Sequence, residues 1–148
     1  MFVIRKNTNT NLICTLQEKV TLTSPYFLFV FTNDVTDVSV TFLQSNISTH
    51  QERYDEFILT ETSGTINYSS GTIELLPLGS WTYKIYEQAS STNLIEANAG
   101  KLLEIGMAKV IGTNESYSTY NGQDITYNLL FLLFLSFLAD VMYSFPFL

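Results

Sequence analysis

The sequence predicts an all-β protein, an antiparallel β-sandwich of about seven to eight short strands. Runs rich in β-branched and aromatic residues recur at spacings of about 8 to 15 residues, and turn-forming residues separate them. The chain shows no convincing amphipathic helix, because its apolar residues alternate or run together instead of recurring at a helical spacing. Since each sheet must bury one face, two sheets packed face to face are the natural solution.

The expected strands occupy eight segments of the first 112 residues. They are residues 2–5, 12–16, 26–32, 35–43, 56–61, 72–76, 81–88 and 101–111. Turn-forming or polar residues fill the breaks between them, where the chain must reverse. These breaks are residues 7–11, 33–34, 44–55, 64–71 and 89–100. We expect the last strand to bend at Gly106.

Residues 26–32 give the strongest strand signal. Three phenylalanines fall on one face of this segment and three further apolar side chains on the other. A strand that is apolar on both faces is typical of a central strand covered on two sides, or of one whose second side meets a partner. In residues 35–43, Val38 and Phe42 alternate with polar residues, which predicts a half-buried strand paired with 26–32 in a hairpin.

Residues 81–88 form a second long alternating strand. Trp81, Tyr83 and Ile85 fall on one face, which we expect to point inward, and Tyr86 falls on the outward face. The segment therefore predicts a strand with an aromatic inner face and a mixed outer face.

Charge and hydropathy divide the chain into unequal parts. The 148 residues carry 7 basic and 14 acidic side chains, a net charge of -7. This balance argues against nucleic acid as the main partner, because phosphate binding needs a clustered basic surface. From residue 126 onwards the only charged residue is Asp140. We expect a sandwich at residues 1–112, a polar linker or arm at 113–127 and an apolar tail at 128–148.

The tail holds an apolar stretch of 11 residues, 129–139. A membrane span needs about 20 residues. Extending the stretch to that length includes Asp140, whose charge costs about 2.5–3.5 kcal/mol near the centre of a span. Three interpretations stay open: a membrane anchor, a helix or strand that docks on a neighbour, and a shifted reading frame that added a segment foreign to the domain. Membrane contact is expected only through this tail.

Side chains that could carry chemistry are few. Cys14 is the single cysteine, which excludes a disulfide within the chain, and we expect it to be a buried, inert thiol. His50, Glu52, Asp55 and Glu56 lie close together in sequence. A single His among carboxylates is weak support for a metal site, so a solvated loop is favoured. No nucleophile elbow, catalytic triad or phosphate-binding loop stands out, and the sequence predicts neither an enzyme nor a cofactor.

Residues 79–87, with the pattern Gly-x-Trp-x-Tyr-x-Ile-Tyr-Glu, resemble the penultimate strand of immunoglobulin-like sandwiches. In that family an aromatic residue follows a glycine-containing turn by two residues and pins the corner. The resemblance implies that Trp81 takes this place and that Tyr83 stands where antibody domains carry a disulfide cysteine. It implies a disulfide-free, immunoglobulin-like antiparallel β-sandwich.

Three features carry a wider resemblance over residues 1–112. They are an Asn/Thr-rich start leading into Leu-x-x-Thr-Leu-x-Glu-Lys-Val-Thr-Leu, the run Pro-Tyr-Phe-Leu-Phe-Val-Phe-Thr-Asn-Asp from residue 25, and the 81–88 strand followed by Leu-Glu-x-Gly-x-Ala-x-Val. In these features the chain resembles small virion proteins of tailed bacteriophages, including crAss-like phages. The resemblance implies a structural or decoration role on the capsid or tail, in many copies that contact other virion proteins. It implies no catalytic residues.

A virion protein would be made in the cytoplasm of the bacterial host, and the start of this sequence lacks the apolar stretch of a signal peptide. The interface candidates are Tyr86, Tyr117, Tyr120 and Tyr127, which fall outside the expected core face or in the arm. Tyrosine suits interfaces because it buries apolar area and keeps a polar group.

Two other functions stay open. One is a carbohydrate- or cell-surface-binding module, in which Trp81 or residues 89–100 would stack on sugars. Burial of Trp81 would remove that candidate platform. The other is a small membrane-tethered protein anchored by residues 129–148.

Overall fold

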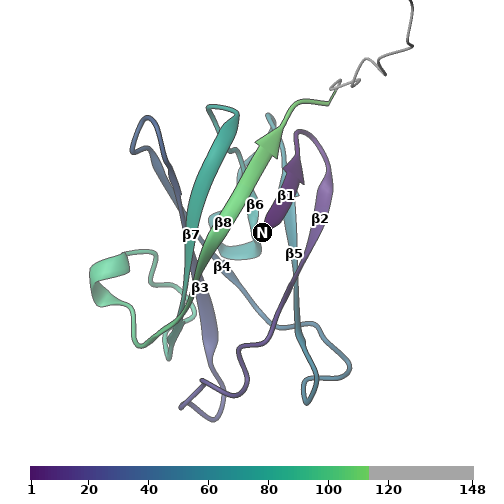
Figure 1. Cartoon of the computed structure of the whole chain (residues 1–148). Helices are drawn as coiled ribbons and strands as arrows, with labels where there is room; N and C mark the ends of the chain where they lie inside the picture. The colour runs from purple at the N-terminus through teal and green to yellow at the C-terminus, as the bar shows by residue number, and fades with distance from the viewer. Residues whose placement is uncertain (114–148) are drawn as a thin grey trace, which may run out of the picture. The chain divides into compact units, whose positions relative to one another are not determined.

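The structure, a computed structural model, describes residues 1–113, which form eight β-strands and two short 3₁₀ helices (Figure 1). The elements in chain order are β1 (Phe2–Arg5), β2 (Asn9–Cys14), β3 (Tyr26–Asn33), β4 (Ser39–Gln44), β5 (Asp55–Glu61), η1 (Tyr68–Ser70), β6 (Thr72–Ile73), β7 (Gly79–Gln88), η2 (Glu96–Asn98) and β8 (Leu102–Ile111). The arm after residue 113 and the apolar tail lie outside the described residues.

The strands form a five-stranded sheet, in the order β1-β8-β7-β3-β4, and a three-stranded sheet, in the order β2-β5-β6. Figure 1 shows the two sheets as the layers of a sandwich. Most neighbouring strands are antiparallel, as the sequence predicts. Two pairs differ, because β1 runs parallel to β8 and β6 runs parallel to β5. The prediction of an all-β sandwich of about eight strands is confirmed.

The strand order is immunoglobulin-like. In immunoglobulin domains the penultimate strand lies between the last strand and the third strand, C, and strands B and E are neighbours in the other sheet. Here β7 lies between β8 and β3, and β2 pairs with β5. The sequence resemblance in residues 79–87 therefore identifies the right strand.

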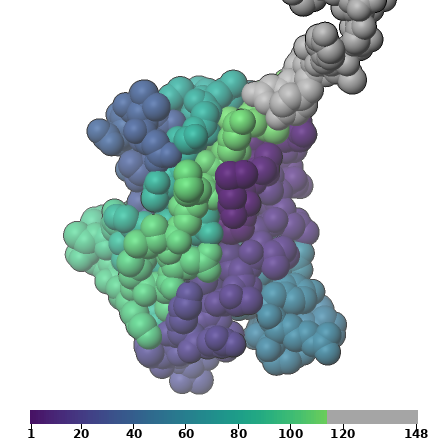
Figure 2. Space-filling view, in the orientation of Figure 1, coloured from purple at the N-terminus to yellow at the C-terminus, as the bar shows by residue number. Residues whose placement is uncertain are grey.

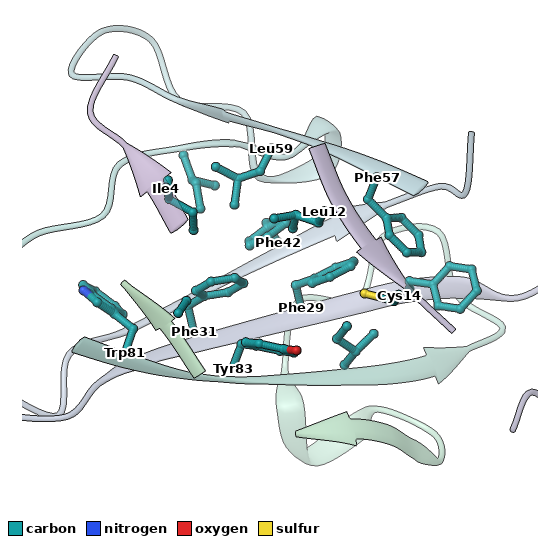
Figure 3. Packing of buried hydrophobic residues seen from close by; sticks show 14 of the residues in the cluster. Ile4, Leu12, Cys14, Phe29, Phe31, Phe42, Phe57, Leu59, Trp81 and Tyr83 are labelled. Atoms are coloured by element: carbon teal, nitrogen blue, oxygen red, sulfur yellow. The ribbon is translucent and has the colours of Figure 1, made fainter. Parts of the chain in front are cut away.

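Aromatic side chains fill the space between the two sheets (Figure 3). Phe29 stacks on Phe42 with ring centroids 5.1 Å apart, and Phe57 of the opposite sheet meets Phe29 edge-on at 5.0 Å. Trp81 and Tyr83 of β7 both point into this core. The inward face predicted for residues 81–88 is confirmed.

A second, smaller apolar cluster lies on the outer face of the five-stranded sheet. Leu28 and Val30 of β3 and Leu43 of β4 are buried there. Tyr86, together with Leu94 and Ala99 from the segment between β7 and β8, packs against them. Strand β3 is thus covered on both sides, as its two apolar faces predict, and the chain itself supplies the second cover.

Trp81 pins the corner before β7. Its indole nitrogen donates a hydrogen bond of 3.1 Å to the carbonyl oxygen of Pro77. A side chain that bonds back to the backbone a few residues upstream is the arrangement of the corner tyrosine in immunoglobulin domains. Cys14 of β2 and Tyr83 of β7 point into the core from the two strands that the disulfide of antibody domains joins.

Some strand boundaries differ from the prediction. Asn9 and Asn11 belong to β2 and not to a turn, because β2 pairs with β5 from Asn9 onwards. Strand β4 starts at Ser39 instead of residue 35, because the Asn33 side chain accepts hydrogen bonds from the backbone of Val35 and Thr36 and holds a turn there. Strand β6 has two residues in place of the five expected at 72–76.

Candidate functional site

One face of the five-stranded sheet exposes a row of apolar side chains, which we call the apolar row. It comprises Val3 of β1, Ile105 and Met107 of β8, and Ile95, which precedes η2; each is between 46% and 60% exposed. Val3 lies beside Lys109 in the β1–β8 pair. Met107 is two residues before Lys109, so its side chain points to the same face of the sheet. Figure 2 shows the N-terminal residues lying against the β8 segment on this face. The row therefore brings exposed apolar side chains of β1 and β8 onto one face of the sheet, with Lys109 between Val3 and the end of the row.

The segment 89–101 extends this face by folding over the neighbouring strands. Glu96 holds it in place, because its carboxylate accepts hydrogen bonds from Lys84 Nζ at 2.8 Å and from Tyr86 Oη at 2.7 Å. The hydrogen bonds from Lys84 and Tyr86 lower the pKa of Glu96 below its ordinary value, against the opposing effect of burial. The Glu96 hydrogen bond likewise raises the pKa of Lys84. The segment is thus fixed to the sheet by an ion pair and by the apolar contacts beneath it.

Tyr86 lies on the outer face of β7, where the alternation predicts it. Its ring packs on the second apolar cluster and its hydroxyl is held by Glu96, so the segment 89–101 covers much of the surface that it would offer a partner. The other three interface candidates, Tyr117, Tyr120 and Tyr127, lie outside the described residues.

A polar hollow of about 250 Å³ lies between two loops. One loop joins β2 to β3, and the other joins β4 to β5. Its lining side chains are neutral, mostly hydroxyls and amides. They are Gln17, Thr23, Ser24, Pro25, Phe27, Ser45, Asn46 and Gln51. The hollow has the chemistry of a site for a neutral polar ligand.

Two buried carboxylates fix the loops around this hollow. Asp55 accepts backbone hydrogen bonds from Leu16 at 2.6 Å and Gln17 at 3.1 Å. Glu87 accepts backbone hydrogen bonds from Thr21 at 2.7 Å and Leu22 at 3.2 Å. Burial pushes the pKa of Glu87 up, but the hydrogen bonds from Thr21 and Leu22 together outweigh it and the pKa is lowered. The carboxylates thus act as anchors for the loop between β2 and β3.

The cluster His50, Glu52, Asp55 and Glu56 is not brought together. His50 Nδ1 lies 3.6 Å from the Glu52 carboxylate, with both side chains exposed. Asp55 is buried toward Leu16, and Glu56 accepts a hydrogen bond of 2.8 Å from the Asn11 side chain. Across residues 1–113 no group of three or more His, Cys, Asp or Glu side chains is placed to hold a metal ion.

Cys14 is buried, as predicted. Burial is the largest cause that raises the pKa of its thiol to about 12, and the carboxylates of Glu104 and Asp55 add to it. Such a thiol is almost never ionised near neutral pH, so it is a poor nucleophile.

Trp81 is fully buried, which removes it as a sugar-stacking platform. The other candidate platform, residues 89–100, contains no aromatic side chain. In the part of the chain that the structure describes, no helix has the length and hydropathy needed to cross a membrane.

Neither the role of Glu96 nor the burial of Asp55 and Glu87 is predicted from the sequence. In the sequence they look like ordinary solvated charges. A usable signal exists for Glu87, because it continues the inward alternation of Trp81, Tyr83 and Ile85, where a charged residue needs internal partners.

No family model and no curated protein matches the chain. A solved structure from Bacteroides vulgatus, provisionally described as a glycoside hydrolase, is similar over 78% of this chain at 13% sequence identity, with a TM-score of 0.41. The matched region covers 17% of that chain. A likeness of this size carries no argument about activity.

Proposed function

We propose that the sandwich is a non-enzymatic structural subunit that acts through protein–protein contacts in the virion of a tailed bacteriophage. The apolar row on β1, β8 and the segment before η2 is the observation that carries the contact role. Apolar side chains gathered on one face, at exposures near one half, mark interaction surfaces more often than scattered single residues do. The placement in a virion rests on the sequence resemblance over residues 1–112.

The chemistry of the row favours a protein partner. Its centre is aliphatic and its edge is charged, with Lys109 beside Val3 and the Lys84–Glu96 ion pair beside Ile105. An apolar centre with a polar rim is the usual composition of a protein interface. We expect the partners to be capsid or tail proteins that present an apolar patch of matching size.

Mass spectrometry of particles purified from a phage that carries this gene tests the virion placement. We expect peptides of this chain at a stoichiometry of many copies per particle. Particles that are free of it would overturn the placement.

Incorporation of variants tests the contact surface. We expect the double change Ile105→Gln and Met107→Gln to lower incorporation at least tenfold, because it removes the apolar centre of the row. The matched control is Ile13→Gln, which changes an isoleucine of similar exposure, 51% against 59% for Ile105, on the outer face of the other sheet. Equal incorporation of the two variants would overturn the role of the apolar row.

A second candidate function is a carbohydrate- or cell-surface-binding module, and the polar hollow between the β2–β3 and β4–β5 loops is the observation that favours it. Its neutral hydroxyl and amide lining suits the hydroxyls of a sugar, and Asp55 and Glu87 hold part of its wall in place. Titration calorimetry with neutral oligosaccharides tests this candidate. Binding that the Gln51→Ala variant abolishes supports it, and no heat at millimolar sugar excludes it for the sugars tried.

A further inference from the structure

Strand β1 covers only part of the free side of β8. The parallel pairing begins with Phe2 beside Ala108 and ends with Arg5 beside Ile111. Along residues 102–107, no strand among the described residues pairs with β8 on the side away from β7. We call this stretch the open edge, and Figure 1 shows β1 beside the upper half of β8.

The backbone groups of Ile105 and Met107 point to the open edge. The carbonyl oxygen of Ile111 accepts a hydrogen bond of 3.0 Å from the Lys6 N–H, so the polar groups of Ile111 face the β1 side. In a strand this direction repeats at every second residue. The side chains of Ile105 and Met107 are 59% and 57% exposed. The open edge is therefore apolar and offers backbone groups to a further strand.

A β-bulge in β8 places Leu102 in the same pattern. Glu104 and Leu102 lie opposite consecutive residues of β7, so Leu103 is an extra residue in the strand. Leu102 is therefore as far from Ile105 in the ladder, on one side, as Met107 is on the other. Since Leu102 is 39% exposed, three apolar side chains stand at equal steps along the open edge.

The backbone of Leu102 also faces the open edge. The Lys101 carbonyl oxygen accepts a hydrogen bond of 2.9 Å from the Glu87 N–H on β7, so the groups of the next residue face away from β7. The open edge is thus its own complement. A half-turn about Ile105 places Met107 where Leu102 stood and leaves Ile105 in position.

We propose that a second copy of the chain pairs with the open edge through its own open edge, antiparallel and about a two-fold axis at Ile105. In this pairing the two Ile105 residues lie opposite each other, and each Met107 lies opposite Leu102 of the second copy. The two Ile105 residues exchange N–H···O=C hydrogen bonds, and each Met107 N–H donates to the Leu102 carbonyl oxygen opposite. The two five-stranded sheets then form one continuous sheet.

Charge and space both favour a second copy at this edge. Chains that each carry a net charge of -7 repel one another, but the three side chains that meet on the outer face are uncharged. Glu104 lies on the inner face, where its carboxylate accepts a hydrogen bond of 2.6 Å from the Tyr83 hydroxyl. The β1 pairing in each copy starts at Ala108, just beyond the paired stretch. The contact uses the same surface on both copies, so it closes as a dimer.

The inference goes beyond the virion role, because it concerns free subunits and holds whatever protein the apolar row contacts. Its tests use the isolated full-length chain. A negative result in them leaves the virion placement to its own experiment, the mass spectrometry of particles.

Sedimentation velocity over a range of protein concentrations tests the dimer. We expect the natural chain to dimerise reversibly, and Ile105→Pro to raise the dissociation constant at least about tenfold, because each copy loses a backbone donor at the centre of the contact. The matched control is Thr41→Pro on the opposite edge strand, β4. The Val38 carbonyl oxygen accepts a hydrogen bond of 2.9 Å from Asn33 on β3, so the Thr41 N–H faces away from β3. A natural chain that stays monomeric, or equal dissociation constants of the two variants, would overturn the proposal.

Disulfide trapping tests the register and needs no proline. We expect Ile105→Cys to form a disulfide-linked dimer on oxidation, because the Cα atoms of such a hydrogen-bonded pair lie about 5.5 Å apart, within the reach of a disulfide. The matched control is Met107→Cys, at a position of nearly equal exposure. In the dimer, residue 107 lies about 13 Å along the strands from residue 107 of the second copy, which is too far for a disulfide. Linkage of Met107→Cys as fast as that of Ile105→Cys, or no linkage of Ile105→Cys, would contradict the pairing.

Discussion

The hydroxyl end of Tyr83 lies directly against Gly106 across the β7–β8 pair, so that a Cβ on Gly106 would come within 3.0 Å of the phenol ring. The ring is held in the core, with its centroid 4.5 Å from that of Phe2, and its hydroxyl donates a hydrogen bond of 2.6 Å to Glu104. Position 106 therefore needs a glycine, because the Tyr83 ring leaves no room there for a Cβ atom. The register shift in this strand pair lies elsewhere, at Ile85 and Tyr86.

Replacing Gly106→Ala should therefore destabilise the fold. The buried Tyr83 ring has no room to move without disturbing the Phe2 contact, and overpacking of this kind costs about 1–3 kcal/mol. Urea unfolding followed by Trp81 fluorescence measures the change. Gly112→Ala is the matched control, because the nearest atom to its Cβ would be 3.7 Å away. A Gly106→Ala variant as stable as the control would contradict the contact.

The sequence predicts most of the architecture, because strand patterns depend on local alternation. Trp81, Tyr83 and Ile85 are inward because side chains alternate every second residue, whatever the rest of the chain does. The short β6 could not be predicted in this way. Its apolar residues continue to Leu75, but the Leu75 N–H bonds to the Glu61 carboxylate instead of a neighbouring strand.

Glu61 should contribute far more stability than Glu74, although both approach Lys6. The Glu61 side chain is fully buried and accepts hydrogen bonds from Lys6, from the Asn7 backbone at 2.7 Å and from Leu75 at 3.2 Å. We expect Glu61→Gln to cost about 2–3 kcal/mol, because an amide NH₂ group would face these donors.

The paired control is Glu74→Gln. The Glu74 side chain is 33% exposed and lies 3.8 Å from Lys6 Nζ, so its removal should cost no more than about 0.5 kcal/mol. The free energy of unfolding in urea at pH 7 compares the two variants. A Glu61→Gln variant within experimental error of Glu74→Gln would show that the buried contacts of Glu61 are not needed for stability.

The position of residues 89–101 against the sheet could not be predicted from the sequence. The segment is polar and has no periodicity, which predicts a loop and nothing about its position. Its place depends on Glu96 meeting Lys84 and Tyr86, three residues that only the β7 alternation and the return of the chain bring together. This contact also covers much of the Tyr86 surface that the sequence offered as an interface.

The Glu96 contact should make stability depend on pH. Its pKa in the folded protein is lowered, first by the hydrogen bond from Lys84 and then by that from Tyr86. The Glu96 contact therefore stabilises the fold fully at pH values above the pKa of Glu in the unfolded chain, which is about 4.3. This stabilisation is lost as the pH falls through the lower pKa that Glu96 has in the folded protein. Because the pair is more than a third exposed, solvent screening limits its size to about 0.5 kcal/mol.

Comparing the natural chain with Glu96→Gln between pH 7 and pH 3 measures this contribution. We expect the natural chain to be the more stable at pH 7 and the difference to shrink as the pH falls. The control Glu52→Gln removes an exposed loop carboxylate and should show a smaller difference at pH 7. If the difference in unfolding free energy between the natural chain and Glu96→Gln grew as the pH fell, the Glu96 contact would not be the source of the pH dependence.

Cys14 should resist thiol reagents until the sandwich unfolds. Its pKa is raised to about 12 by burial first and by Glu104 and Asp55 second, so at pH 8 its thiolate fraction is on the order of a thousandfold below that of a free cysteine. Ile13, the neighbouring residue on β2, points to the opposite, exposed face. The control is therefore Ile13→Cys combined with Cys14→Ser, which should react at the rate of a free thiol. The two cysteines lie at adjacent positions of one strand and meet the same reagent, so only burial distinguishes them. Rapid labelling of Cys14 in the folded chain would therefore mean that the space between the sheets opens to water near β2.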